Sequence, residues 1–132
     1  MKFLIVFALI AIVSVVSAAD ADVKEQNQRV EEHVTKCRSK HPIKDEQLAL
    51  LKDGKVTEGS DDERCFVNCF MEESGIMVDG KIQKEKAIKA FSVRIGEEKA
   101  IEAFEKCQSE VGSAKCETAL KMHNCFHAQG VY

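Results

Sequence analysis

The sequence predicts an all-α fold, a bundle of six helices cross-linked by three disulfides. Three observations lead to this prediction. Apolar residues recur at helical spacing along most of the chain, and the alternating pattern typical of strands is nearly absent. The six cysteines are an even number. The chain also opens with the pattern of a secretory signal, which would carry these cysteines to an oxidising compartment where disulfides form.

The pattern of residues 1–19 predicts a secretory signal peptide. A single positive charge at Lys2 precedes an apolar run that ends at Val16, and small residues follow. The run is too short for a membrane span, which needs roughly twenty apolar residues. Residues 20–132 are then expected to form one helical domain, in a protein that is secreted and extracellular.

The charge of the mature chain argues against nucleic acid as a partner. Without Lys2 the chain carries eighteen Lys and Arg against twenty-two Asp and Glu, a net charge of −4. Nucleic-acid binding needs clustered positive charge, whereas lysines are interspersed with glutamates here. No metal or other cofactor is expected, because Cys65 and Cys69 have no second cysteine pair at the spacing of a zinc site.

The first predicted helix carries a narrow apolar stripe and stops before a proline. Val23, Val30, Val34 and Cys37 fall on one side of this helix. Pro42 then ends the segment, since proline lacks the backbone N–H that a helix needs.

Capping residues define the next two helices. Residues 45–52 predict a short helix, and Gly54 can take the left-handed conformation that closes it. Ser60 and Glu63 have the spacing of a capping box, which opens a third helix that ends at Gly75. Apolar residues and cysteines surround most of this third helix, so we expect it to be the central and most buried one.

Turn residues and glycines separate the last three predicted helices. Asp79-Gly80 is a turn before the fourth helix, and the fifth follows Gly96 and ends at Gly112. Ser113 is expected to cap the sixth. The inward faces consist of Ala87, Ile88, Phe91 and Ile95 in the fourth helix; Ala100, Ile101, Phe104, Cys107 and Val111 in the fifth; and Cys116, Ala119, Leu120, His123 and Phe126 in the sixth.

Helical geometry limits how the six cysteines can pair. Cys65 and Cys69 lie on one helix face but cannot easily bring their Cβ atoms to the roughly 3.8 Å of a disulfide. Cys116 and Cys125 are nine residues apart, so they face opposite sides of the last helix. Excluding these two pairs leaves ten of the fifteen possible pairings.

The complete cysteine spacing is Cys37-x27-Cys65-x3-Cys69-x37-Cys107-x8-Cys116-x8-Cys125. It resembles the six-cysteine signature of the insect odorant-binding proteins, and the three-residue and final eight-residue gaps are the most specific parts of the match. The resemblance covers essentially the whole mature chain. It implies one of the ten remaining pairings, with the bridges Cys37–Cys69, Cys65–Cys116 and Cys107–Cys125.

The resemblance also implies a function. The helices would enclose an apolar ligand cavity, and the protein would carry an odorant, a pheromone or a similar small hydrophobic molecule through aqueous fluid. The implied partners are this ligand and a chemosensory receptor, with the chain a monomer or weak homodimer. The alternative is a secreted inhibitor or signalling protein that acts through its surface, although the loops are short and polar.

Enzymatic activity is not expected. A helical, disulfide-rich phospholipase would need a helix histidine beside adjoining cysteines and a glycine-rich calcium loop, and the sequence has neither. Gly-x-Ser-x-Gly, His-Glu-x-x-His and the dinucleotide-binding glycine motif do not occur in it.

Nine residues on inward helix faces are predicted to line the ligand cavity. Phe104 and Val30, by contrast, are expected to belong to the core alone. The predicted lining consists of Leu48, Leu51, Phe66, Phe70, Ile88, Phe91, Leu120, His123 and Phe126.

His123 is the one ionisable residue of this set. As a neutral imidazole it would offer one polar contact to a hydroxyl or carbonyl group of the ligand, and burial is expected to lower its pKa. Charging on acidification would then favour release. The alternative is a histidine at a helix end without a role in binding. The residues that follow Phe126 are too few to form another helix that fills the cavity.

Overall fold

A computed structural model describes residues 23–132 of the chain. The predicted signal peptide, residues 1–19, lies outside this range. Residues 33–132 form one compact unit, and residues 23–32 fall in a second unit. Residues 23–40 are helical, and this first segment ends ahead of Pro42 as the sequence predicts.

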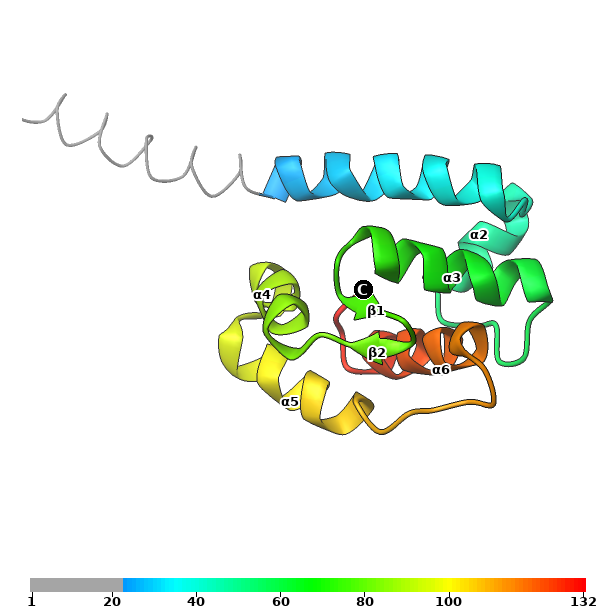
Figure 1. Ribbon diagram of the computed structural model, residues 1–132. Coiled ribbons are helices and arrows are strands. Elements are labelled where there is room, and N and C mark those ends of the chain that lie inside the picture. The colour runs from blue at the N-terminus through cyan, green and yellow to red at the C-terminus, as the bar shows by residue number, and fades with distance from the viewer. Residues whose placement is uncertain (1–22) are drawn as a thin grey trace, which may run out of the picture. The chain divides into compact units, whose positions relative to one another are not determined.

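The described residues contain six helical segments, so the predicted all-α class is confirmed (Figure 1). No helix among them is both long enough and apolar enough to cross a membrane. The first segment, 23–40, is followed by α2 (Asp45–Lys52), α3 (Asp61–Glu73), β1 (Met77–Val78), β2 (Lys81–Ile82), α4 (Lys84–Ile95), α5 (Glu97–Cys107) and α6 (Lys115–Ala128).

Local capping chemistry sets the boundaries of α2 and α3 as predicted. Gly54, just after α2, has a φ of +66°, a conformation that residues with a Cβ atom rarely adopt. Before α3, the Glu63 N–H donates to the Ser60 hydroxyl at 3.2 Å, and the Ser60 N–H donates to the Glu63 carboxylate at 3.0 Å. Both bonds of the capping box are therefore present.

The predicted turn at Asp79-Gly80 connects a small hairpin that the sequence analysis did not anticipate. Met77 pairs with Ile82 and Val78 with Lys81 in antiparallel register. Both turn residues have positive φ, +50° and +76°, as a two-residue type I′ hairpin turn requires. Each strand has only two residues, too few for an alternating pattern to stand out.

The predicted end of the fifth helix is wrong. We expected this helix to continue through Val111 to Gly112, but α5 ends at Cys107. The Glu110 N–H donates to the Cys107 carbonyl at 3.1 Å, which turns the chain out of the helix. Val111 is consequently not part of the inward stripe and is 65% exposed.

The predicted cap of the sixth helix is also wrong. Ala114, not Ser113, is the N-cap of α6, and it makes no side-chain cap bond. Ser113 instead directs both its backbone N–H and its hydroxyl to the carboxylate of Glu117, at 3.0 and 2.6 Å. Ser113 thus fixes the connection before α6 through a residue of the first helical turn.

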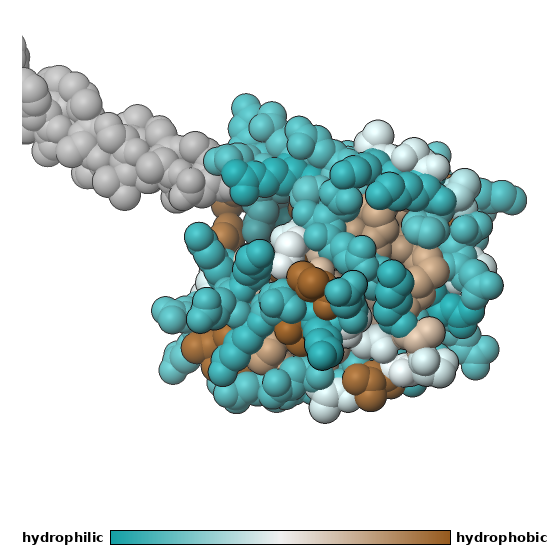
Figure 2. Space-filling view, in the orientation of Figure 1, coloured by the Kyte–Doolittle hydropathy of each residue, from teal (hydrophilic) through white to brown (hydrophobic). Residues whose placement is uncertain are grey.

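The core lies where α3, α4, α5 and α6 pack together. α3 packs against α6, α4 against α5, and α5 against α6, an arrangement that can be followed in Figure 1. The predicted central helix α3 therefore shares the interior with α6. Hydrophilic residues cover most of the face seen in Figure 2. The largest fully buried side chains are those of Phe126, Leu51, Met71, Met77, Leu120 and Val131.

Candidate ligand-binding site

Each of the three disulfides joins two different helices. They connect the first helical segment to α3, α3 to α6, and α5 to α6, and the pairing that the resemblance implied is confirmed. The bridged pairs and their Cα separations are Cys37–Cys69 at 5.7 Å, Cys65–Cys116 at 4.7 Å and Cys107–Cys125 at 5.6 Å.

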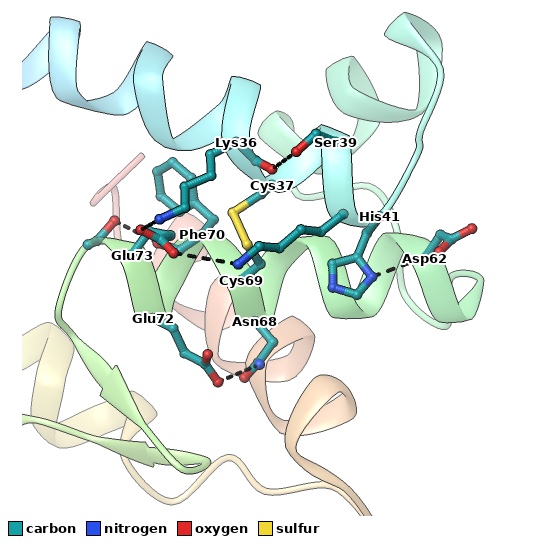
Figure 3. The surroundings of a disulfide bond; sticks show 12 residues. Lys36, Cys37, Ser39, His41, Asp62, Asn68, Cys69, Phe70, Glu72 and Glu73 are labelled. Carbon is teal, nitrogen blue, oxygen red and sulfur yellow. Dashed lines mark hydrogen bonds and ion pairs between the residues drawn. A yellow bond between two sulfur atoms is a disulfide. The ribbon is translucent and has the colours of Figure 1, made fainter.

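Charged residues lie beside the buried Cys37–Cys69 bridge, nearer the protein surface (Figure 3). Lys36 Nζ lies 2.9 Å from Glu73 Oε2, and Lys40 Nζ lies 4.0 Å from Glu73 Oε1. The hydrogen bond from Lys36 is the main reason that the pKa of Glu73 is lowered. The end of the first helical segment is therefore held to α3 by a covalent bridge and by ion pairs.

The interior contains a different kind of cluster, built from aromatic rings. The rings of Phe91 from α4 and Phe126 from α6 lie 4.7 Å apart between centroids, and both side chains are buried. The Tyr132 ring lies 4.8 Å from the imidazole of His123 and 6.4 Å from the Phe91 ring. Tyr132 thus contacts two residues that the sequence analysis assigned to the ligand cavity.

His123 is tied to α2 through one hydrogen bond. Its Nε2 lies 2.7 Å from the backbone carbonyl oxygen of Leu51. Because a carbonyl oxygen can only accept, Nε2 is the protonated donor and the neutral ring leaves Nδ1 as an acceptor. Burial lowers the pKa of His123, the hydrogen bond to Leu51 opposes this shift, and the charge of His127 adds to it. The predicted direction of the pKa shift is confirmed.

Tyr132 is a member of this cluster that the sequence analysis missed. It follows α6 and Gly130, and the neighbouring Val131 is anchored by its N–H, which donates to the Phe126 carbonyl at 3.1 Å. The residue as a whole remains 39% exposed, but desolvation of its hydroxyl group raises the pKa of Tyr132 far above the usual range of tyrosine. No sequence pattern indicates a contact of this kind, since it depends on the packing of α4 against α6.

Three other residues of the predicted lining are buried in the same core. Leu51, Phe66 and Leu120 expose only 2%, 4% and 1% of their surface. Phe104, which we assigned to the core alone, is buried as well. Burial alone therefore does not distinguish lining from core.

The remaining three predicted residues lie nearer the surface. Leu48, Phe70 and Ile88 are only partly buried. The ring of Phe70 meets the imidazole of His33 edge-on at 6.1 Å. Ile88 lies, together with Ile101, in a surface groove of about 460 Å³ on the outer side of α4 and α5. The nine residues thus differ in depth, from fully buried to partly exposed.

Comparison with known proteins identifies the family. The model of the PBP/GOBP family matches residues 19–129. The chain belongs to this family. These are the insect odorant-binding proteins that the cysteine spacing had indicated, a family of carrier proteins and not of enzymes. Among curated relatives, general odorant-binding protein 56a of Drosophila melanogaster is 30% identical over 122 residues, which cover 92% of this chain and 85% of the relative.

Solved structures of odorant-binding proteins have the same fold. One is described as the fatty acid binding protein OBP56a from the oral disk of the blowfly Phormia regina. It is 28% identical with a TM-score of 0.67, and the match covers 80% of this chain and 92% of that one. Odorant-binding protein 4 of Chrysopa pallens has a TM-score of 0.71 over 82% and 92% of the two chains. At 21% identity, this second likeness concerns the fold alone.

Proposed function

We propose that this protein is a secreted carrier that binds a small apolar molecule in its interior and transports it through aqueous fluid. Family membership supports the carrier function. The observation that carries the proposal is the row of ring contacts from Phe126 through Phe91 and Tyr132 to the half-buried imidazole of His123. Aromatic rings with one polar group among them are the usual lining of a site for an apolar ligand.

The cargo class that we propose is a molecule with a medium or long alkyl chain. The blowfly relative is described as a fatty acid binding protein, which supports this choice. Burial of roughly ten methylene groups contributes about 8 kcal/mol of transfer free energy. About 8.2 kcal/mol corresponds to a micromolar dissociation constant. Immobilisation of the ligand lowers the affinity and contacts with aromatic rings raise it, so we expect a dissociation constant in the micromolar range.

We further propose that the ligand takes the place of the Tyr132 ring. This ring now contacts both His123 and Phe91, and Tyr132 belongs to a segment outside any helix or strand. A small displacement of this segment would free the face of the imidazole and one side of the Phe91 ring for a ligand. The nine predicted residues remain our proposal for the surroundings of the ligand, with Tyr132 added as the side chain that it displaces.

Native mass spectrometry of the protein purified from its own secretion tests the function. A retained small molecule with an alkyl chain is the expected result, and titration of the delipidated protein with the same compound should give a micromolar dissociation constant. A protein that is always empty, and that copurifies with a stoichiometric protein partner, would contradict the carrier function. That result would favour an inhibitor or signalling protein that acts through its surface.

A further inference from the structure

We infer that His123 selects ligands that donate a hydrogen bond, so that the carrier prefers an apolar alcohol to an ether or aldehyde of the same size. This inference rests on the proposed carrier function and adds a chemical class to it. It concerns the ring nitrogen Nδ1 of His123, which the bond to α2 leaves unused.

The bond between α6 and α2 fixes the tautomer of the imidazole. His123 Nε2 lies 2.7 Å from the Leu51 carbonyl oxygen, which has no proton to give. The proton of the neutral ring must therefore reside on Nε2. Leu51 is itself only 2% exposed, and its carbonyl oxygen also accepts from the Gly54 N–H at 3.1 Å, so the acceptor of the His123 bond is fixed in place. The protein thus holds the neutral ring in one tautomer and one orientation.

The second ring nitrogen is consequently an acceptor only. Within residues 23–132, the structure contains no hydrogen bond to His123 Nδ1. Nδ1 is not among the buried polar atoms that lack a partner, so water can reach it in the free protein, and a ligand that covers it would have to replace this water. The neighbouring Tyr132 presents its ring, tilted by 31°, to the face of the imidazole. Tyr132 in turn meets the ring of Phe91, which packs against Phe126.

Ligand groups differ sharply in what they can offer to such an acceptor. A hydroxyl group brings a proton and can donate to Nδ1, whereas an ether or an aldehyde brings only lone pairs. An ionised carboxylate also brings only lone pairs. A site that is built to make one hydrogen bond discriminates against analogues that cannot make it, because its polar group is then left unpaired. The discrimination expected for one neutral hydrogen bond is roughly threefold to tenfold in affinity.

The test compares three ligands of nearly equal size, dodecanol, dodecanal and methyl undecyl ether. Dissociation constants are measured by calorimetry for the wild-type protein and for His123→Leu. The three ligands differ in solubility, and this difference affects both proteins equally. The difference in binding free energy between two ligands is therefore compared between the wild type and the variant, which isolates the contribution of the His123 side chain. The affinity for dodecanol relative to that for dodecanal or the ether should be roughly threefold to tenfold higher in the wild type than in the variant.

A measurement on the wild type keeps the inference testable if His123→Leu does not fold. The ¹⁵N chemical shifts of the imidazole report which nitrogen is protonated. We expect a proton on Nε2 in the free protein and a shift of the Nδ1 signal with dodecanol but not with the ether. A proton on Nδ1, or equal shifts with both ligands, would overturn the inference.

The outcomes separate this inference from the function on which it rests. An alcohol preference that is the same in the wild type and in His123→Leu would overturn the selection by His123 and leave the carrier function intact. Failure of the wild type to bind any of the three would overturn the proposed function, and the inference with it.

Discussion

Two regions of the compact unit are held together by different means. Around α3, the Cys37–Cys69 bridge and the ion pairs of Glu73 join two helices covalently and through exposed charges. Around His123, α4 and α6 meet through ring contacts, and one hydrogen bond reaches α2. The first region is held by a covalent bond and by ion pairs of partly exposed side chains, whereas the second is held by contacts that a ligand could replace. The comparison therefore suggests that a ligand can rearrange the second region while the first keeps the helices in place.

The largest effect is expected from removal of a bridge. Replacing both Cys37 and Cys69 by Ala should lower the free energy of unfolding by roughly 2–4 kcal/mol, because the unfolded chain is no longer restricted. Urea unfolding measures this loss. In the folded variant the affinity for an alkyl ligand should change less than twofold. A greater change would show that the two regions are not independent.

A matched pair of phenylalanines separates binding from stability. Phe91→Leu and Phe104→Leu each remove a buried ring, and each should cost about 1 kcal/mol of stability. Only Phe91 contacts Tyr132 and Phe126 within the aromatic cluster. Titration with dodecanol should therefore show several-fold weaker binding for Phe91→Leu and little change for Phe104→Leu. Equal losses of affinity would mean that the cluster is ordinary core.

Removal of the Tyr132 ring should affect stability and binding in opposite directions. Tyr132→Ala deletes two ring contacts, which together stabilise the protein by about 1 kcal/mol. The ligand would no longer compete with this ring, so the affinity for dodecanol should rise. Thermal unfolding and calorimetry on the same sample measure the two effects. A lower affinity would mean that Tyr132 contacts the ligand and does not give way to it.

The titration of His123 should make the second region sensitive to acid. Burial holds the pKa of His123 below its ordinary value of 6.5, so the unfolded chain binds a proton more readily than the folded one. The stability that the neutral ring contributes is complete above pH 6.5 and is lost as the pH falls below this value. The pKa values of Glu73 and Glu117 are also lowered, but from an ordinary value of 4.5, so these two groups change the stability only below about pH 4.5.

Unfolding and ligand titrations at pH 7.5 and pH 5.5 test this sensitivity. The wild type should lose more stability than His123→Gln between the two values, and its ligand affinity should fall on acidification while that of the variant stays nearly constant. The other described histidines are common to both proteins, so their contributions cancel in the comparison. The same pH dependence in wild type and variant would exclude His123 as the titrating group.

The two regions also differ in how far the sequence predicts them. Local chemistry determines the capping box of Ser60 and Glu63 and the left-handed Gly54, so both could be derived residue by residue. The disulfide pairing required the family resemblance, because helical geometry alone left several pairings open. The errors occurred at Val111 and Ser113, where an apolar residue and a capping residue lie in a connection and not in a helix.

The candidate site was less predictable because it depends on contacts between helices. The stripe of α6 correctly placed His123 and Phe126 toward the interior. The same kind of pattern assigned Ile88 to the lining; Ile88 packs against the core and also borders a surface groove beside α4 and α5. Periodicity identifies the apolar face of a helix but not the part of that face that meets a neighbour. The position of Tyr132 follows from packing alone.

Nuclear Overhauser effects between bound dodecanol and the isotope-labelled protein test the central claim, which is binding among the interior rings. We predict effects from the methylene protons of the ligand to the ring protons of Phe91 and Phe126, with loss of the effects between Tyr132 and His123 when the ligand is added. Effects confined to Ile88 and Ile101, which lie in the outer groove of α4 and α5, would place the ligand on the surface and contradict the account.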